Sequence, residues 1–133
     1  MFLSNLIHEL KNTELRLHSP RPAESVITFD RSWEGAFCGY TTIIKDADLL
    51  RMYYRGLPTA GRDGTDTEVT CYAESKDGIH WVKPELDFYS FEDTKKTNIV
   101  WRGAGAHTGL GPFKDTNPDC KPNERYKALA SNG

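Results

Sequence analysis

Alternating apolar and polar positions between Thr67 and Trp81 predict two strands that fold back on each other. In the first strand, small and apolar side chains share one face, namely Val69, Cys71, Ala73 and Ser75. The other face carries Thr70, Tyr72 and Glu74. A period of two residues is typical of a half-buried strand, so this stretch is the clearest strand in the chain.

A hairpin turn follows this strand. Asp77 and Gly78 suit the turn because glycine adopts the positive φ that such turns need and aspartate tolerates it. Ile79 and Trp81 begin the return strand, which Pro84 ends because proline has no N–H group to give to a sheet.

Two earlier strands complete the pattern. Residues 37–45 are rich in β-branched side chains, and residues 49–55 return after a tight turn. In the second of these, one face carries Leu50, Met52 and Tyr54, and the other carries Arg51, Tyr53 and Arg55. Residues 37–83 therefore predict four antiparallel strands in an up-and-down meander, which is the size of one β-propeller blade.

The rest of the chain is organised around this meander. Residues 1–36 form an N-terminal segment with a short lead-in strand at 26–29, and residues 84–133 form a connector and the start of a second blade. Within that second part, residues 98–101 open the blade, and residues 112–115 and 125–130 pair as strands. One and a half blades cannot close a ring, and open sheet edges are avoided in natural proteins. We therefore expect an all-β chain that is an N-terminal fragment of a β-propeller.

Composition narrows the classes of function. The chain has 133 residues and a net charge of −2, so it is one small domain without the basic surface that nucleic acid or an anionic membrane would need. It contains no apolar run long enough to span a bilayer, and its first residues lack the pattern of a signal peptide. The three cysteines and four histidines lack the spacing of metal ligands, so no metal and no cofactor are expected. Cys38 and Cys71 are expected to be free, buried thiols.

The positions of Ser75, Asp77, Gly78 and Trp81 resemble the S-x-D-G-x-x-W hairpin of sugar-processing β-propellers, a relative of the Asp box of sialidases. In that hairpin the polar side chains hold the turn and the tryptophan packs beneath it. Together with the segments at 30–35, 51–56, 71–81, 98–100 and 124–128, it resembles a bacterial family labelled glycosyl hydrolases related to families 32 and 43. The resemblance implies a five-bladed β-propeller and a glycoside hydrolase acting on an unknown carbohydrate. The alternative is a carbohydrate-binding propeller without catalysis, because a fold does not fix an activity.

The resemblance also implies where acid–base chemistry would lie. Glycoside hydrolysis needs two carboxyl groups across the scissile bond. Asp115 resembles the stabilising Asp of the second blade, with an Asx-turn residue as the alternative. Glu34 is the candidate base of the first blade, with a linker residue that pairs with Arg31 or Arg55 as the alternative. The general acid is expected beyond Gly133, so this fragment alone is expected to be inactive.

Three residues are candidates for substrate binding. Trp33 offers an aromatic face to a sugar ring. Arg55 offers a guanidinium to sugar hydroxyls or to the carboxylate of an acidic sugar, although an arginine is also a common partner of a nearby Asp or Glu. His107 lies in a glycine-rich loop that could line the mouth of the channel or simply face solvent.

Overall fold

The computed structural model describes residues 9, 11–14, 16–59, 65, 67–103 and 110–130. Nearly all of its regular structure is β-strand, and this confirms the all-β class predicted from the sequence. The only helical element in the described ranges is the short 3₁₀ helix η1 (Pro122–Glu124).

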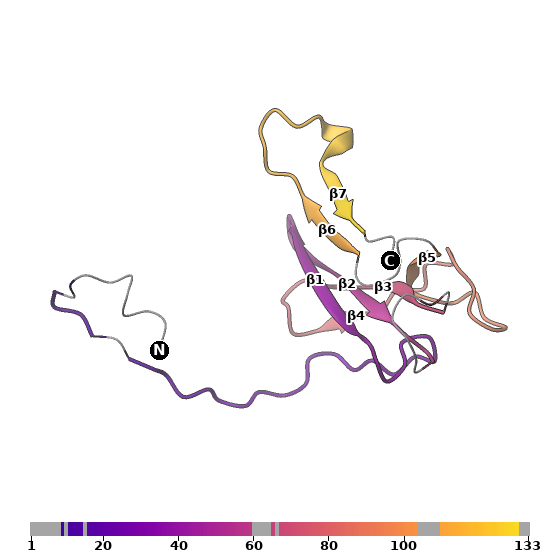
Figure 1. The fold of residues 1–133 in the computed structure, drawn as a ribbon, viewed down its shortest axis with the longest axis horizontal. Coiled ribbons are helices and arrows are strands. Elements are labelled where there is room, and N and C mark those ends of the chain that lie inside the picture. The colour runs from indigo at the N-terminus through magenta and orange to yellow at the C-terminus, as the bar shows by residue number, and fades with distance from the viewer. Residues whose placement is uncertain are drawn as a thin grey trace.

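The largest element is an antiparallel sheet whose first four strands follow one another in chain order (Figure 1). These strands are β1 (Gly39–Asp46), β2 (Leu49–Gly56), β3 (Val69–Ser75) and β4 (Trp81–Val82). They confirm the meander predicted for residues 37–83. A fifth strand, β5 (Ile99–Arg102), also pairs with β3. Because β2 occupies one edge of β3, β4 and β5 share its other edge, one at each end.

A second, two-stranded sheet contains β6 (Gly111–Lys114) and β7 (Tyr126–Leu129). It confirms the predicted pairing of residues 112–115 with residues 125–130. In Figure 1 this hairpin rises from the end of β1 near the β1–β2 turn, where Lys114 contacts Asp46 at 2.7 Å.

Two predictions differ from the structure. Residues 26–29 form no strand. The side chains of Ile27 and Phe29 pack against the core, but the backbone of this segment does not pair with a strand of the sheet. Residues 98–101 were expected to open a second blade, whereas β5 completes the first sheet by pairing with β3. Asn98 holds this segment in place: its backbone carbonyl accepts a hydrogen bond from the backbone N–H of Tyr72, and its side-chain amide donates to the carbonyl of the same residue.

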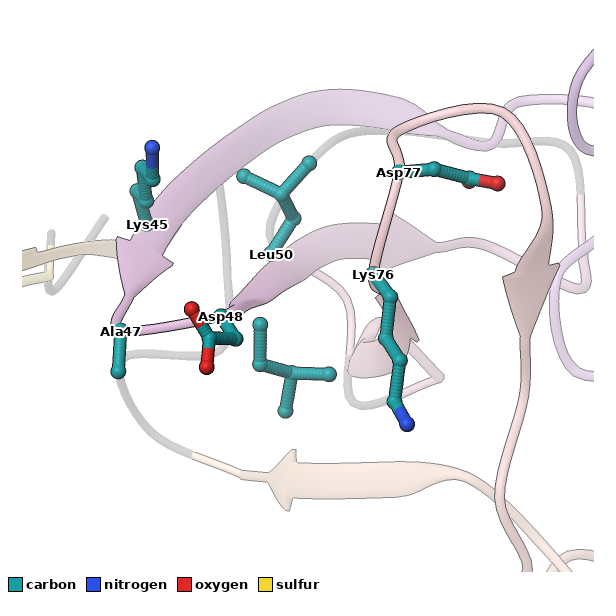
Figure 2. A pocket seen from close by; sticks show the side chains of 7 residues that line it. Lys45, Ala47, Asp48, Leu50, Lys76 and Asp77 are labelled. Carbon is teal, nitrogen blue, oxygen red and sulfur yellow. The ribbon is translucent and has the colours of Figure 1, made fainter.

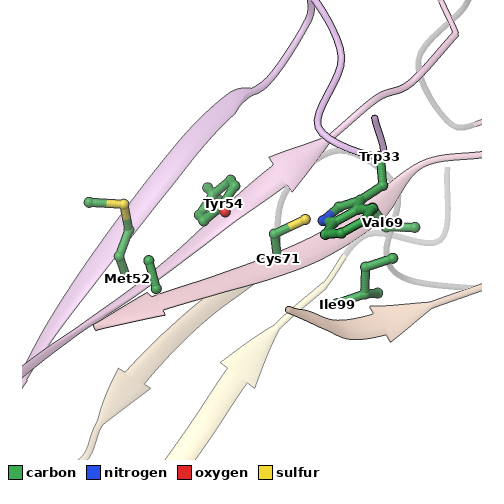
Figure 3. Close-up of a cluster of buried hydrophobic side chains, with 7 residues drawn as sticks. Trp33, Met52, Tyr54, Val69, Cys71 and Ile99 are labelled. Carbon is green, nitrogen blue, oxygen red and sulfur yellow. The ribbon is translucent and has the colours of Figure 1, made fainter. Parts of the chain in front are cut away.

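The hydrophobic core lies on one face of the sheet and is centred on β2 and β3. Figure 3 shows side chains from both strands meeting residues from the flanking segments. The buried set is Trp33, Met52, Tyr54, Val69, Cys71, Ala73 and Ile99. Burying each large side chain of this kind stabilises the fold by roughly 1.5–3 kcal/mol. The connector contributes Tyr89 and Phe91 to this core, whereas Phe88 is 67% exposed.

The β3–β4 turn has the hydrogen bonds expected for the Ser–Asp–Gly–Trp hairpin. The hydroxyl of Ser75 accepts from the backbone N–H of Gly78, and Asp77 Oδ1 accepts from the backbone N–H groups of Ile79 and His80. Gly78 has φ +78°, and the indole N–H of Trp81 donates to its carbonyl at 3.0 Å. These side chains are therefore fully engaged in holding the turn.

Candidate functional site

Three of the predicted site residues lie at one end of the main sheet, around the C-terminal end of β2. Arg55 belongs to β2, and the loop that carries Trp33 and Glu34 packs onto the residues that follow it. The backbone N–H of Leu57 donates to the carbonyl of Glu34 at 2.8 Å. Gly35 permits this contact, because it has φ +67° and an added Cβ would lie 2.0 Å from the carbonyl oxygen of Leu57.

Glu34 is completely buried and is the centre of a polar network. Its Oε1 accepts from the hydroxyl of Tyr54 at 2.5 Å. Its Oε2 accepts from the ammonium of Lys83 at 2.8 Å and from the backbone N–H of Arg31 at 2.8 Å. Both carboxylate oxygens are thus occupied. The predicted ion-pair alternative for Glu34 is realised, but with Lys83 as the partner in place of Arg31 or Arg55.

Trp33 packs in the core rather than lining an open surface. Its side chain is part of the buried cluster, and only 6% of the residue is exposed. The indole N–H donates to Oδ1 of Asn98 at 2.7 Å. In this structure the ring has no face available for stacking on a sugar.

The accessible part of the site is formed by two aromatic residues, Phe37 and Tyr40, and Arg55 lies beneath them with its side chain only 10% exposed. Its guanidinium lies 4.3 Å from the ring centroid of Tyr40, and its Nη2 donates to the carbonyl of Phe37 at 3.1 Å. Its Nη1 pairs with the buried carboxylate of Glu68 at 3.4 Å. Phe37 and Tyr40 are 50% and 56% exposed, so an aromatic surface with a fixed cation beneath it faces solvent.

Tyr40 is placed by an irregularity in the sheet. Gly39 pairs with Arg55 and Thr42 pairs with Tyr53, so one extra residue lies on β1 between these pairs. Tyr40 has φ +49°, a left-handed conformation that costs energy for a large side chain. Bulges of this kind redirect side chains and occur often beside active sites. Neither Tyr40 nor Glu68 was predicted from the sequence, because neither a bulge nor an ion pair between residues 13 apart has a local sequence signal.

Asp115 lies beside the second sheet, away from Trp33, Glu34 and Arg55. Asp115 directly follows β6. Its carboxylate accepts a hydrogen bond from the ammonium of Lys127 at 2.5 Å and another from the backbone N–H of Asn117 at 2.8 Å. These contacts hold the pKa of Asp115 at about 2, with the Lys127 hydrogen bond as the largest cause. The neighbouring Lys114 contacts the β1–β2 turn, whereas Glu34 contacts the far end of β2. The chain therefore does not bring Glu34 and Asp115 together. The third predicted binding residue, His107, lies outside the described residues.

Asp46 connects the two sheets. Its carboxylate accepts from Lys114 at 2.7 Å, from the Tyr126 hydroxyl at 2.8 Å and from Nε of Arg51 at 3.0 Å. The hydrogen bond from Lys114, followed by that from Tyr126, lowers the pKa of Asp46 from 3.8 to about 2.

This lowered pKa predicts acid-sensitive docking of the β6–β7 hairpin. Because the folded-state pKa is below the unfolded value, ionised Asp46 stabilises the docked state above about pH 4, and this contribution is lost as the pH falls through about 2. We expect Asp46→Asn to lower the melting temperature at pH 7, and the difference from the wild type to shrink towards zero by about pH 2. Thermal unfolding between pH 2 and 7, followed by circular dichroism, measures this. Asp93→Asn, at an exposed turn, is the matched control. A difference that persists undiminished at pH 2 contradicts the assignment.

A hollow of about 350 Å³ lies between the β1–β2 turn and the β3–β4 turn (Figure 2). Its walls include Lys45, Asp48, Leu50, Lys76 and Asp77. None of the predicted site residues lines this hollow, and Asp77 is already engaged by the turn and by His80. It is therefore a weaker candidate than the Tyr40–Arg55 surface.

Metal and thiol chemistry find little support in the described part of the chain. No group of three His, Cys, Asp or Glu side chains is arranged there to hold a metal ion. Burial raises the pKa of Cys71 well above its ordinary value and that of Cys38 to about 12, so both thiols are protonated at neutral pH. No described helix is long and apolar enough to cross a membrane.

Comparisons with models of protein families, with curated proteins and with solved structures find no match for this chain.

Proposed function

We propose that the chain is part of a glycoside hydrolase-like protein that acts on a carbohydrate, and that its own contribution is a sugar-binding surface at the start of β1. The proposal includes a β-propeller architecture, five-bladed when complete, of which this chain carries about one and a half blades. The four-stranded meander and the side-chain hydrogen bonds of its tryptophan-anchored turn support this architecture.

The observation that carries the proposal is the exposed, strained aromatic at the bulge. Tyr40 has positive φ and projects from the sheet with Arg55 stacked against its ring. Arg55 is itself held by Glu68 and by the carbonyl of Phe37, so the surface is preorganised. Aromatic faces beside fixed polar donors suit sugars, which have both apolar C–H faces and hydroxyl groups.

A second candidate is a carbohydrate-binding protein without catalysis. Glu34 has no exposed surface, and the lysine partners of Glu34 and Asp115 differ, with the first pair beside the main sheet and the second beside the β6–β7 sheet. Inverting and retaining glycosidases need two carboxyl groups within roughly 5–10 Å of each other. The two predicted catalytic carboxylates, Glu34 and Asp115, are not arranged as such a pair, since each is held by a different lysine.

Substitution of Tyr40 tests the binding surface. Tyr40→Gly removes the ring, and glycine accepts the positive φ without strain, so we expect the fold to be kept or slightly stabilised. We expect binding of oligosaccharides to fall by about ten-fold or more, since one aromatic stacking contact is lost. A glycan array identifies a ligand, and isothermal titration calorimetry then measures its dissociation constant.

Phe88→Ala is the matched control, because Phe88 is an exposed aromatic distant in sequence from the bulge. It should leave the dissociation constant unchanged. Equal affinity of the Tyr40→Gly variant and the wild type, with both folded, would remove the basis of the proposal.

Hydrolysis of the bound glycan separates the two candidate functions. If the protein releases reducing sugar, Asp115→Asn should reduce the rate while binding persists, as expected for a group that assists catalysis. If no glycan that binds is ever hydrolysed, the non-catalytic alternative holds.

A further inference from the structure

A second cleft lies on the face of the main sheet opposite the hydrophobic core, where the β6–β7 hairpin meets β1 and β2. We call it the seam cleft, and it is lined by Asp46, Arg51, Tyr53 and Tyr126, with a volume of about 280 Å³. Its residues come from both sheets, so its shape depends on the docking of the hairpin. It is separate from the Tyr40–Arg55 surface, which lies at the other end of β2.

The acidic residue of the seam cleft, Asp46, already has hydrogen-bond partners within the protein. Asp46 accepts hydrogen bonds from Lys114, Tyr126 and Arg51, and this fixes the positions of all three donors. Arg51 also donates from Nη1 to the hydroxyl of Tyr72 at 3.0 Å, which in turn donates to Glu74. The guanidinium is thus held rigidly by groups on β1 and β3.

Two polar groups of the seam cleft remain unused within the described residues. Nη2 of Arg51 makes no hydrogen bond there, and neither does the hydroxyl of Tyr53. The Arg51 side chain is 35% exposed, so a ligand can reach it. A preorganised donor pair of this kind loses little entropy when it binds.

The charge balance around the seam cleft favours an anion. Arg51 and Lys114 together carry two positive charges against the single negative charge of Asp46. Asp46 raises the pKa of Lys114, and the positive charge of nearby Arg125 acts in the opposite direction. Glu74 lies beyond Tyr72 and does not line the cleft.

We propose that the seam cleft binds a hexuronic acid residue of a carbohydrate, with the sugar carboxylate on Nη2 of Arg51 and a sugar oxygen on the hydroxyl of Tyr53. The rings of Tyr53 and Tyr126 provide the apolar contact for the sugar, as aromatic side chains do in polar sites. An arginine held in one orientation suits a carboxylate better than a neutral hydroxyl group. This inference rests on the proposed carbohydrate function and names a ligand class for it.

The experiment compares three probes at pH 7: galacturonate, galactose and acetate. Ligand-observed NMR and calorimetry should give galacturonate an affinity about ten-fold or more above that of galactose, because the charge-assisted hydrogen bond is absent from the neutral sugar. Acetate should bind much more weakly than galacturonate, because it lacks the ring. The preference for galacturonate should fall as salt is added.

Variants locate the binding. Arg51→Gln should abolish the preference for galacturonate, and Tyr53→Phe should weaken its binding by a few-fold. Arg51→Lys keeps the charge but loses the planar donor arrangement, so it should retain only part of the preference. Arg102→Gln is the matched control with the same change of charge, because Arg102 lies on β5 and donates to Ser90. If Arg51→Gln fails to fold, Tyr53→Phe and Arg51→Lys still test the site.

Several outcomes overturn the inference. Equal binding of galacturonate and galactose would show that the site does not recognise the sugar carboxylate. Equal binding of acetate and galacturonate would show an anion site that does not recognise the sugar ring. A preference that survives in the folded Arg51→Gln variant puts the ligand elsewhere. If these tests fail while oligosaccharide binding still depends on Tyr40, the seam cleft alone is refuted. If Tyr40-dependent binding fails as well, the proposed function falls with it.

Discussion

We expect Glu34→Ala to be the most destabilising single substitution at the polar network, lowering the free energy of unfolding by about 3–5 kcal/mol. Glu34 is fully buried, and its partner Lys83 has a side chain only 10% exposed. Removing the carboxylate leaves the largely buried Lys83 ammonium with only the exposed Asp30 as its ion-pair partner, and the hydroxyl of Tyr54 without its acceptor. A largely buried charge that loses its buried partner costs far more than a lost surface ion pair.

Urea unfolding followed by tryptophan fluorescence measures this effect. Glu85→Ala is the matched control, because Glu85 and Lys96 form an exposed pair at 3.5 Å, and its loss should cost less than about 1 kcal/mol. The double variant Glu34→Gln with Lys83→Met removes both charges and should be more stable than Glu34→Ala. A cost for Glu34→Ala as small as that for Glu85→Ala would show that the carboxylate does not hold the loop.

This result would also bear on the predicted catalytic role of Glu34. A residue whose loss unfolds the sheet end is a structural anchor, and one that faces substrate is usually less important for stability. Kinetics of the Glu34→Gln variant would therefore be interpretable only alongside its stability. Asp115, which is partly exposed and lies outside the core, is the cleaner position at which to test catalysis.

The strands of the main sheet could be predicted because their signals are local. Alternation marks Val69–Ser75, and the Asp77–Gly78 turn and Trp81 define the return strand within a few residues. The hydrogen bonds of that turn connect residues at most three apart in the chain, so the motif contains all the information needed.

The candidate site was harder to predict because its contacts are distant in sequence. Glu34 meets Lys83 across 49 residues, and Trp33 meets Asn98 across 65. Glu34 was interpreted as a candidate base or a linker residue because it lies in the turn-like segment 30–35, and nothing local shows that it folds inward. The same applies to Tyr40, whose exposure depends on a bulge in the pairing of β1 with β2.

Asn98 should be the second most sensitive position, with Asn98→Ala lowering the free energy of unfolding by about 3 kcal/mol or more. Its Oδ1 accepts from the indole of Trp33 at 2.7 Å, and its Nδ2 donates to the Tyr54 hydroxyl at 2.7 Å and to the Tyr72 carbonyl at 2.6 Å. The substitution leaves these three buried groups without this partner, and each unsatisfied group costs about 1–3 kcal/mol. The loss exceeds that of a typical surface amide because water cannot replace the bonds.

Chemical denaturation of Asn98→Ala beside Asn117→Ala measures this difference. Asn117 is exposed, and its side chain accepts one turn hydrogen bond from Asp119, so its replacement should cost less than about 1 kcal/mol. A cycle that combines Asn98→Ala with Tyr54→Phe should show strong coupling, because Tyr54 links Asn98 to Glu34. Additive effects in that cycle would mean that the two residues act independently. The anchoring of β5 and the burial of Glu34 would then be separate features of the fold, and the network proposed at this end of the sheet would not exist as a unit.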